Sequence, residues 1–494
     1  MSKADKKSKK PKDLARKPRG FPDKREALIH AEREMIDRVT AVYRRWGFEA
    51  LDTGAFEYVD ALGKFLPDTD RPNDGVFALT DDDEQWMALR YDLTAPLARF
   101  AAEHWTHLPK PFRRYAFGPV WRNEKPGPTR FREFLQCDAD TVGTDHPASD
   151  AEMVAMAAEA MEAAGAAPGE YVIRVNTRRL LNAVLDRAGA AAPDTRLSVL
   201  RALDKMDRLG ADGVRDLLGA GREDESGDFT KGAGLSVDGI DTALAFAAAG
   251  RDTRADTLAA LAGIVGGTQD GDAGLNELAA IEAALRGLGV ADAAVAFDPS
   301  IVRGLEYYTG PVFEAELLRE VTGEDGKPVR IGSVGGGGRY DDLVARFTGE
   351  RVPATGFSVG VSRLASAMAL AGETEELNGP VVVLNLDADH IADTLAMVTE
   401  LRQAGLRAEA YLGTSGMRAQ MKYADRRGAP AAVIVGEDER ASGEVTIKDL
   451  KLGALKAKAI KDNAEWREER PGQFSCPRSE LVARIRAVVE GEGA

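Results

Sequence analysis

The sequence predicts an α+β protein of several domains, in which a strand-rich part is interrupted by a helical insertion and followed by a separate α/β domain. Three observations support this prediction. Residues 114–140 read as two strands joined by a Gly/Pro loop, residues 194–289 are Leu/Ala/Asp-rich helical segments broken by acidic glycine loops, and strands and helices alternate from residue 380 onward. The 494 residues have room for about three domains at ~150 residues each.

The charge balance and the cysteine content argue against several classes of protein. A formal net charge of −15 excludes a generally basic surface, so a nucleic-acid partner would have to meet local basic patches. Only two cysteines, Cys137 and Cys476, and the lack of an apolar run of ~20 residues argue against a disulfide scaffold and a membrane span. No secretory signal follows the basic N-terminus, and the five histidines lack metal-ligand spacing. We therefore predict a cytoplasmic protein with no membrane partner and no structural metal.

The N-terminal part of the chain predicts a tail followed by a long helix. Residues 1–20 contain nine Lys/Arg and almost nothing apolar, which is typical of a disordered basic tail that aids solubility or touches RNA. From Ala27 to Trp46 apolar residues recur at helical spacing, and Gly47 is a suitable stop. The segment FEALDTGAFE reads as a strand, and an acidic hairpin is expected around residues 81–84.

The segment RYDLT lies just before a helix that we expect to begin near Pro96. Asp92 and Thr94 are two residues apart, so on an extended backbone both side chains point the same way. Two interpretations are open: the pair contacts a ligand, or Asp92 caps the following helix.

The two strands within residues 114–140 place unlike side chains on their two faces. With a period of two, the first strand groups Arg114, Val120 and Arg122 opposite Tyr115, Phe117 and Trp121. In the second strand the apolar face holds Phe131, Leu135, Cys137 and Ala139, and the polar face holds Arg130, Arg132, Phe134, Gln136, Asp138 and Asp140. Guanidiniums, an amide and carboxylates on one face suit a ligand with a polyanion and a small polar group. A solvated face with chance ion pairs is the alternative for this stretch alone.

Beyond the helical insertion, strand patterns return at Val295, and the last of them runs into a helix whose first turn carries Arg363. The C-terminal α/β pattern, from VVVLNL to EVTIKDL, forms a compact domain of roughly a hundred residues. Its helix from Met417 to Gly428 is basic, with cations at Arg418, Lys422, Arg426 and Arg427. This face is either a nucleic-acid contact or a solvated helix surface.

Five motifs occur in a fixed order along the chain: RYDLT, WRNE with TRFREFLQCDAD, VRGLEYY, GGGGRYDDL and GFSVGVSRL. Together they resemble the histidyl-tRNA synthetases, which are class II enzymes with an antiparallel catalytic sheet and a C-terminal anticodon-binding domain. The resemblance covers about residues 20–453, and the chain lacks GxxxxGK[ST] and the HIGH and KMSKS signatures of class I synthetases. It implies a catalytic domain in two parts (21–193 and 293–372), a helical insertion domain (194–292) and an anticodon-binding domain (379–494) after the basic tail.

The resemblance also implies an activity, its cofactors and its partners. Members of this family ligate L-histidine to tRNA(His) through a histidyl-adenylate, as homodimers that use ATP and Mg²⁺. On the family pattern Arg122 contacts the α-phosphate of ATP beside Glu124, Arg363 contacts the terminal phosphates, and Arg303 bridges the α-phosphate and the substrate carboxylate. Arg122 and Arg303 are thus the implied catalytic residues.

The family pattern further implies how histidine and tRNA are bound. Asp92 and Thr94 match the holders of the α-amino group, and Gln136 lies over the carboxylate end. The residues that match the imidazole pocket or lie near it are Asp140, Tyr307, Tyr308 and Tyr340. The implied tRNA contacts are Lys125, in the loop at the acceptor end, and the helix residues Arg418, Lys422 and Arg426.

Two other interpretations share this resemblance. The synthetase-like regulatory subunit of ATP phosphoribosyltransferase keeps the core fold, but it is expected to lack the anticodon domain and several of the arginines that this chain has. A class II synthetase for threonine or proline is not expected to carry VRGLEYY, and the zinc set expected for threonine is missing.

The chain departs from the family pattern at two places, and one specificity question stays open. Gly54 stands where class II enzymes usually have a proline, in a segment that belongs to the family's dimer interface. The stretch after Leu450 matches nothing in the pattern. Many members read an extra 5′ guanosine on their tRNA, and the KPGPT loop gives no base-reading side chain that decides the matter.

Overall fold

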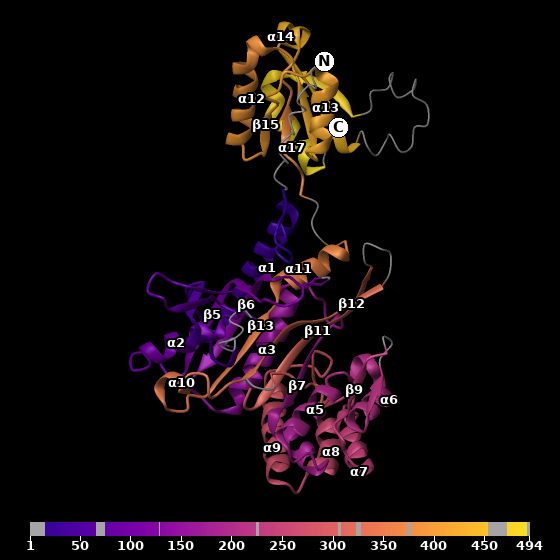
Figure 1. Ribbon diagram of the computed structural model, residues 1–494. Coiled ribbons are helices and arrows are strands. Elements are labelled where there is room, and N and C mark those ends of the chain that lie inside the picture. Colours follow the sequence, from indigo (N-terminus) through magenta and orange to yellow (C-terminus); the bar gives the residue numbers. More distant parts are fainter. Residues whose placement is uncertain are drawn as a thin grey trace, which may run out of the picture. The chain divides into compact units, whose positions relative to one another are not determined.

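The computed structural model describes residues 15–65, 75–127, 129–223, 227–304, 308–322, 328–372, 377–452 and 472–491. The chain divides into two compact units, residues 1–374 and 375–494 (Figure 1). Most of the expected basic tail lies outside the described residues. Among the residues described, no helix combines the length and the apolar character that crossing a membrane requires.

The first unit is built on an eight-stranded sheet, counted over the described residues. In sheet order its strands are β1 (Glu49–Ala50), β5 (Phe112–Trp121), β6 (Glu133–Val142), β13 (Ala354–Val359), β12 (Pro328–Arg339), β11 (Pro311–Thr322), β7 (Tyr171–Thr177) and β10 (Val295–Phe297). The pairs from β5 to β7 are antiparallel, and only the outer strands β1 and β10 pair in parallel with their neighbours. The expected antiparallel catalytic sheet is therefore confirmed.

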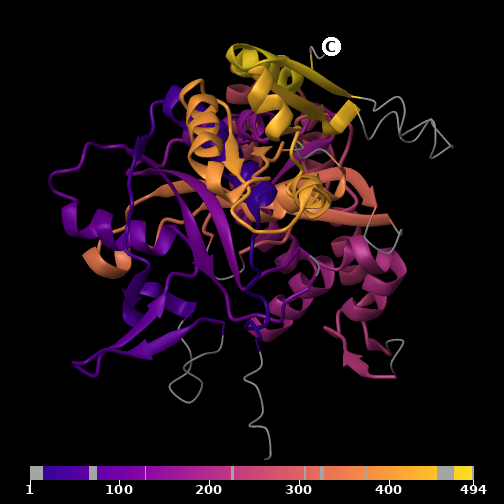
Figure 2. The same ribbon diagram turned by 90° about the horizontal axis from the view of Figure 1, so that it is seen from above.

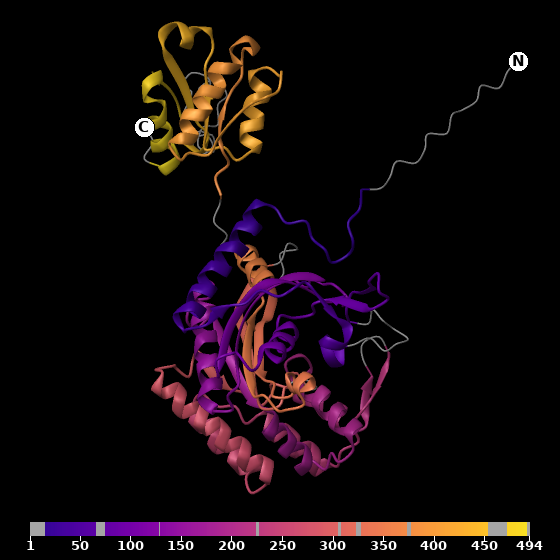
Figure 3. The same ribbon diagram turned by 90° about the vertical axis from the view of Figure 1, so that its left-hand side faces the viewer.

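Three helices cover the apolar face of this sheet: α1 (Glu26–Arg45), α3 (Pro147–Ala163) and α11 (Val361–Leu370) (Figure 3). The alternation expected for the second strand of the hairpin decides which face they cover. Cys137 and Ala139 of β6 are fully buried in the core under these helices, whereas Gln136, Asp138 and Asp140 face the other way. The polar face is thereby left open for a site.

The helical segments expected within residues 194–292 form one group with the preceding helix α4, beside the β7–β10 end of the sheet (Figures 1 and 2). The group comprises α4 (Arg178–Arg187), α5 (Pro193–Leu203), α6 (Met206–Leu218), α7 (Val237–Ala247), α8 (Arg254–Val265) and α9 (Gln269–Gly287). Ser236, Thr253 and Thr268 cap α7, α8 and α9 with their side chains. A small hairpin of β8 (Gly221–Glu223) and β9 (Phe229–Lys231) was not expected, because its glycine-rich sequence reads as a loop. The apolar side chains of these helices belong to the same core as the sheet.

A second, three-stranded sheet flanks the site and consists of β2 (Phe56–Tyr58), β4 (Trp86–Leu89) and β3 (Ala78–Thr80). The prediction of a single strand in FEALDTGAFE is wrong. The chain forms β1, has no strand at residues 51–55 around Gly54, and then enters β2 in another sheet. Strand β4 leads through residues 90–93 into α2 (Thr94–His104), and α10 (Ala345–Thr348) packs against α2.

The second unit has a five-stranded sheet of β15 (Ala408–Ala410), β14 (Val381–Val383), β16 (Ala431–Ile434), β17 (Glu444–Asp449) and β18 (Gln473–Pro477). Its helices are α12 (Ile391–Gln403), α13 (Met417–Arg426), α14 (Glu437–Ser442) and α17 (Leu481–Glu490). The stretch after Leu450 that matched no pattern returns as β18, which pairs with β17, and then as α17, which buries Leu481 and Ile485 in this unit's core. Residues 453–471 lie outside the described part.

Candidate active site

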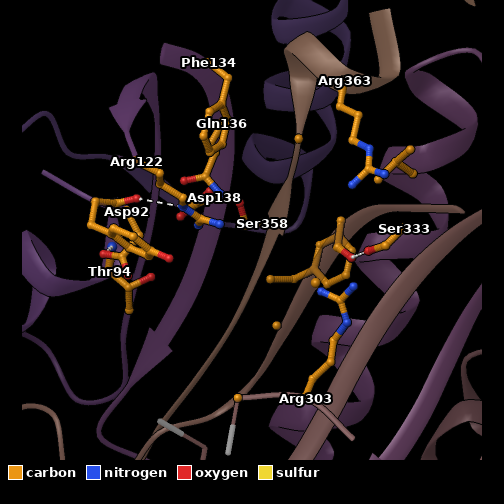
Figure 4. Close-up of a pocket in the computed structure, with 18 of the residues that line it drawn as sticks. Asp92, Thr94, Arg122, Phe134, Gln136, Asp138, Arg303, Ser333, Ser358 and Arg363 are labelled. Atoms are coloured by element: carbon orange, nitrogen blue, oxygen red, sulfur yellow. Dashed lines mark hydrogen bonds between the residues drawn. The ribbon is translucent and has the colours of Figure 1, made fainter. Parts of the chain in front are cut away.

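A pocket of about 550 Å³ opens on the polar face of the large sheet (Figure 4). Its floor comes from β6, β13 and the glycine-rich end of β12. Its walls come from residues 91–94, the loop after β5, the start of α11, and Arg303, Gly304 and Tyr308. Segments far apart in sequence thus deliver side chains to one cavity. The strand order β5-β6-β13-β12 is what brings them together.

Strand β6 supplies a row of three polar side chains to the floor: Gln136, Asp138 and Asp140. The row follows from strand alternation, with two-residue steps of about 6.6 Å. Gln136 Nε2 donates a 2.9 Å hydrogen bond to Ser358 Oγ of β13, which fixes the amide at one end of the row.

Asp140 is held at the other end of the row by two partners. The guanidinium of Arg114 on β5 is fully buried, and its Nη2 lies 2.9 Å from Asp140 Oδ2 while it donates to Leu93 O at 2.8 Å. The Tyr340 hydroxyl donates to Asp140 Oδ1. Burial raises the pKa of Asp140, and Arg114 and Tyr340 oppose that rise. Gly356 is required opposite, because a Cβ there would lie 1.9 Å from Asp140 Oδ1.

Asp138, in the middle of the row, forms no ion pair among the described residues, and Arg114 acts on it only from the position opposite Asp140. In the sheet register it lies between Ala116 of β5 and Ser358 of β13, and its side chain is almost fully buried. Among the described residues no hydrogen-bond donor reaches its Oδ1. Burial raises the pKa of Asp138 to about 7, with Arg114 and Ser358 opposing the rise and Asp140 and Asp92 adding to it.

The structure decides one of the two interpretations of RYDLT. Asp92 Oδ1 accepts hydrogen bonds from Thr94 N (3.0 Å) and Ala95 N (2.9 Å), so Asp92 caps α2, which begins at Thr94 rather than near Pro96. Asp92 and Thr94 nevertheless both line the pocket. The two backbone hydrogen bonds engage Oδ1, and Figure 4 shows Asp92 beside Thr94 and Arg122 in the pocket.

The opposite end of the pocket is lined with arginines. Arg122 lies over the rings of Tyr91 (4.3 Å) and Phe134 (5.2 Å), which hold its guanidinium flat. Arg303 pairs with Glu314 of β11. Arg363 Nη2 donates to Ile331 O at 2.8 Å, whereas its buried Nε has no partner among the described residues. Burial lowers the pKa of Arg363, and the neighbouring Arg130 and Arg303 lower it further. Arg130, Arg303 and Arg363 repel one another in this way, so an anion bound between them would be stabilised.

The two ends of the site are joined by a buried cluster on the helical face. Ser362 Oγ donates to Glu32 of α1 (2.6 Å) and accepts from Leu135 N of β6 (3.0 Å). Lys24 Nζ completes the cluster at 2.7 Å from the Glu32 carboxylate. Because Ser362 precedes Arg363 and Leu135 precedes Gln136, one hydroxyl fixes the backbone next to Arg363 and next to a floor residue.

The structure brings nearly all the site residues expected in the first unit into this pocket. Those that line it are Asp92, Thr94, Arg122, Glu124, Lys125, Gln136, Asp140, Arg303, Tyr308, Tyr340 and Arg363. Tyr307 lies outside the described residues. Sequence reasoning assigned no role to Asp138, Ser333 or Ser358, which also line the pocket. Strand alternation placed Asp138 on the polar face without giving it a role, whereas the positions of the two serines depend on strand order.

The remaining expected residues lie on α13 in the second unit. Arg418, Lys422 and Arg426 are exposed, whereas Arg427 makes hydrogen bonds of 2.9 and 3.0 Å to Glu409. The helix is anchored by buried Gln420, whose amide bonds the backbone of Asn385 and Ser415. An exposed apolar residue, Leu412, precedes this helix.

The raised pKa of Asp138 predicts how stability changes with pH. Its folded-state pKa of about 7 exceeds the ordinary value of 3.8, so the folded chain binds more protons between these values and stability falls as pH rises through this window. Asp138→Asn removes this titration. The free energy of unfolding of the variant should therefore rise relative to that of the parent between pH 5 and pH 8, by on the order of 2–4 kcal/mol at pH 8. Apparent Tm values against pH measure this difference. Asp145→Asn, an exposed position after the same strand, is the control, and a gap that stays constant with pH for Asp138→Asn would contradict the prediction.

Comparison with known proteins identifies the family. Residues 20–364 match the family model for histidyl-tRNA synthetase, and residues 380–470 match that for an anticodon binding domain. The chain is 63% identical over 480 residues to the histidine--tRNA ligase of Caulobacter vibrioides (97% of each chain) and 54% identical over 496 residues to that of Bradyrhizobium diazoefficiens (98% of each). The crystal structure of histidyl-tRNA synthetase from Nostoc sp. PCC 7120 superposes with a TM-score of 0.69 at 28% identity, covering 96% of this chain and 99% of that one. Because the match extends over nearly the full length of these relatives, the chain belongs to the histidyl-tRNA synthetase family.

Proposed function

We propose that this pocket activates L-histidine with ATP to form histidyl-adenylate, and that the chain then transfers the histidyl group to tRNA(His). The observation that supports this is the division of one cavity into an arginine-lined end and a carboxylate-lined end. A polyanion fits the first end, and a small zwitterion with a polar ring fits the second.

In the activation step the substrate carboxylate attacks the α-phosphorus, and pyrophosphate leaves. Negative charge grows on the phosphate oxygens, so fixed guanidiniums can supply most of the catalysis and no side-chain nucleophile is needed. Arg122, held flat by two rings, contacts the α-phosphate, and Arg363 contacts the terminal phosphates with its free Nε. Arg303, oriented by Glu314, bridges the α-phosphate and the carboxylate.

Magnesium would enter this site together with ATP. No group of three or more metal-ligating side chains occurs among the described residues, so the ion would take most of its ligands from phosphate and water. Glu124 lines the pocket two residues after Arg122, and its carboxylate chemistry suits a hard cation. When bound, the ion would neutralise part of the phosphate charge.

Histidine would lie along β6 with its carboxylate toward Gln136 and its ring toward Asp140. Asp92 and Thr94 would hold the α-amino group. Neutral imidazole has one N–H donor and one acceptor nitrogen, so a carboxylate and a phenolic hydroxyl can satisfy both. Asp140 supplies the carboxylate, and Tyr308 with Tyr307 supplies the phenolic hydroxyl. Tyr340 keeps Asp140 in place through its hydrogen bond.

The alternative, a regulatory subunit of ATP phosphoribosyltransferase, has weaker support. A structure described as an ATP phosphoribosyltransferase regulatory subunit/histidyl-tRNA synthetase from Bacillus halodurans superposes with a TM-score of 0.64 at 22% identity, a likeness in fold alone. The arginine-lined end of the pocket and the second unit both favour the ligase.

The test of the proposed activity is pyrophosphate exchange, followed by aminoacyl transfer, with each of the amino acids in turn. We expect exchange and charging with histidine only. Arg303→Ala is the matched negative variant, because it should abolish exchange while circular dichroism shows an intact fold. Exchange with another amino acid, or substantial exchange by folded Arg303→Ala, would overturn the assignment.

The imidazole assignment predicts a selective effect of Asp140→Asn. The substitution keeps the size but replaces a charged acceptor with a neutral amide, which should cost ~1.5–3 kcal/mol of histidine interaction. The KM for histidine should rise while that for ATP changes little. If the ATP dependence changed and the histidine dependence did not, Asp140 would belong to the nucleotide side.

A homodimer is the assembly that the first unit favours. Tyr58 of β2 and Leu79 of β3 both lie opposite Met87 of β4, so with Phe56 they share one face of the small sheet. Their exposures of 54%, 42% and 46% leave an apolar face open, and such faces typically mark protein–protein contacts. Gly54 lies just before this face, in the segment that the family uses at its dimer interface.

The second unit supplies the tRNA contact in this proposal. Arg418, Lys422 and Arg426 are exposed on one helix and can meet phosphates, while Leu412 can pack on a base. Lys125, beside the pocket, would meet the acceptor end. The described cysteines, Cys137 and Cys476, are both free and buried, which agrees with a cytoplasmic location.

A chain that ends at residue 372 tests both the assembly and the tRNA contact. It retains the whole pocket and the apolar face, so it should sediment as a dimer and make histidyl-adenylate at the rate of the full chain. It should charge tRNA poorly, because α13 is absent. Charging as efficient as that of the full chain would refute the role of the second unit, and a monomer would refute the assignment of the dimer face.

A further inference from the structure

The three aspartates of the pocket differ in what already holds them. Asp140 pairs with Arg114 and accepts from Tyr340, and Asp92 Oδ1 accepts two backbone N–H bonds. Asp138 is 2% exposed, and Ser358 bonds its carboxyl group. Its Oδ1 has no hydrogen-bond partner within the described part of the chain and, unlike Asp140 Oδ2, no ion pair with an arginine. The proposed activity so far gives Asp138 no role.

A buried carboxylate oxygen without a donor is unfavourable in a folded protein. Leaving such a group unpaired costs on the order of 1–3 kcal/mol, and more when it is charged. The register places Ala116 on one side of Asp138 and Ser358 on the other. Arg114 of β5 lies opposite Asp140, so it pairs with that carboxylate and acts on Asp138 only from the next position along the strand. A donor for Oδ1 therefore has to come from the pocket, which Asp138 lines.

The position of Asp138 limits which group of a bound amino acid can reach it. It stands one two-residue step, about 6.6 Å, from Gln136 and from Asp140, between the carboxylate end and the ring end of the substrate. The part of histidine that lies between these ends is the α-carbon with its ammonium group. Asp92 also lines the pocket and adds to the pKa rise of Asp138, and Figure 4 shows it on the same side of the pocket as Asp138.

We propose that the Asp138 carboxylate receives the α-ammonium group of the amino-acid substrate, together with Asp92; this inference rests on the activity proposed above. An ammonium has three N–H donors, so Asp92, Thr94 and Asp138 together satisfy all of them. The pKa of Asp138, raised to about 7, fits this role, because a cation bound there restores the ionised form. Asp138 is thus a specificity determinant for an α-amino acid as opposed to its deaminated analogue.

Three ligands distinguish the contribution of the ammonium group to binding from that of the ring. They are histidine, histamine, which lacks the carboxylate, and 3-(imidazol-4-yl)propionate, which lacks the ammonium. Their affinities are measured by calorimetry, or as inhibition of histidine-dependent pyrophosphate exchange, on full-length parent and Asp138→Asn chains. We expect histidine and histamine to bind the variant about ten- to a hundredfold more weakly, the range for a lost hydrogen bond to a charged group. The propionate should bind both chains equally.

Asp140→Asn is the matched control, because it makes the same substitution one step along the same strand. It should weaken all three ligands, since all three carry the ring. Asp138→Ser provides a second variant with a smaller neutral side chain, and circular dichroism checks the fold of each.

Two results would overturn the inference: unchanged histidine affinity in both Asp138 variants, or equal weakening of histidine and the propionate, which would place Asp138 at the ring. Neither result touches the proposed activity, which fails only if the parent chain shows no histidine-dependent exchange.

Discussion

The buried Arg114 guanidinium is the charge on which the site depends. A guanidinium with no exposed surface is stable only when it is paired and hydrogen-bonded. Arg114 reaches from β5 to Asp140 on β6 and to Leu93 O at the start of α2. Arg122 follows β5, Gln136 lies on β6 and Asp92 precedes α2, so one cation sets the relative positions of these three side chains. Removing it would leave Asp140 as an uncompensated buried charge.

The surrounding sheet brings acidic and basic side chains into one cavity. Carboxylates occupy the β6 row and the cap of α2, and arginines occupy the loop after β5, residue 303 and the first turn of α11. A ligand with a cationic centre and a polyanion finds partners of opposite charge for both parts in such a cavity. The Ser362–Glu32–Lys24 cluster on the opposite face of the sheet then keeps the backbone of both ends at a fixed separation.

Local sequence patterns were sufficient for the β6 row, the helix that carries Arg363 and the basic helix α13, because each depends on periodicity within one segment. They could not show that Ser358 bonds Gln136 or that Glu314 pairs with Arg303, since those contacts exist only once β13 lies beside β6 and β11 approaches residue 303. The single strand predicted through Gly54 was wrong. The point at which the chain leaves one sheet and enters another has no side-chain periodicity that the sequence could show. For Asp92 the sequence offered a helix cap and a ligand contact as alternatives. The structure shows the cap, and the same side chain also lines the pocket.

The groups left without a partner within the described part of the pocket also explain how selection could occur without a separate editing site. Gln136 Oε1, Asp138 Oδ1, Asp140 Oδ2 and Arg363 Nε are buried and without a hydrogen bond among the described residues. Each is held by a strand or helix that has little freedom to turn it elsewhere. A ligand that supplies the missing hydrogen-bond partner removes a free-energy cost that is already present in the free protein. An analogue that lacks the matching group leaves that term in place, and sites of this kind reject such analogues by ~10⁴ or more in the best cases. Discrimination would then come from the unpaired atoms themselves, because only the correct substrate satisfies all of them at once.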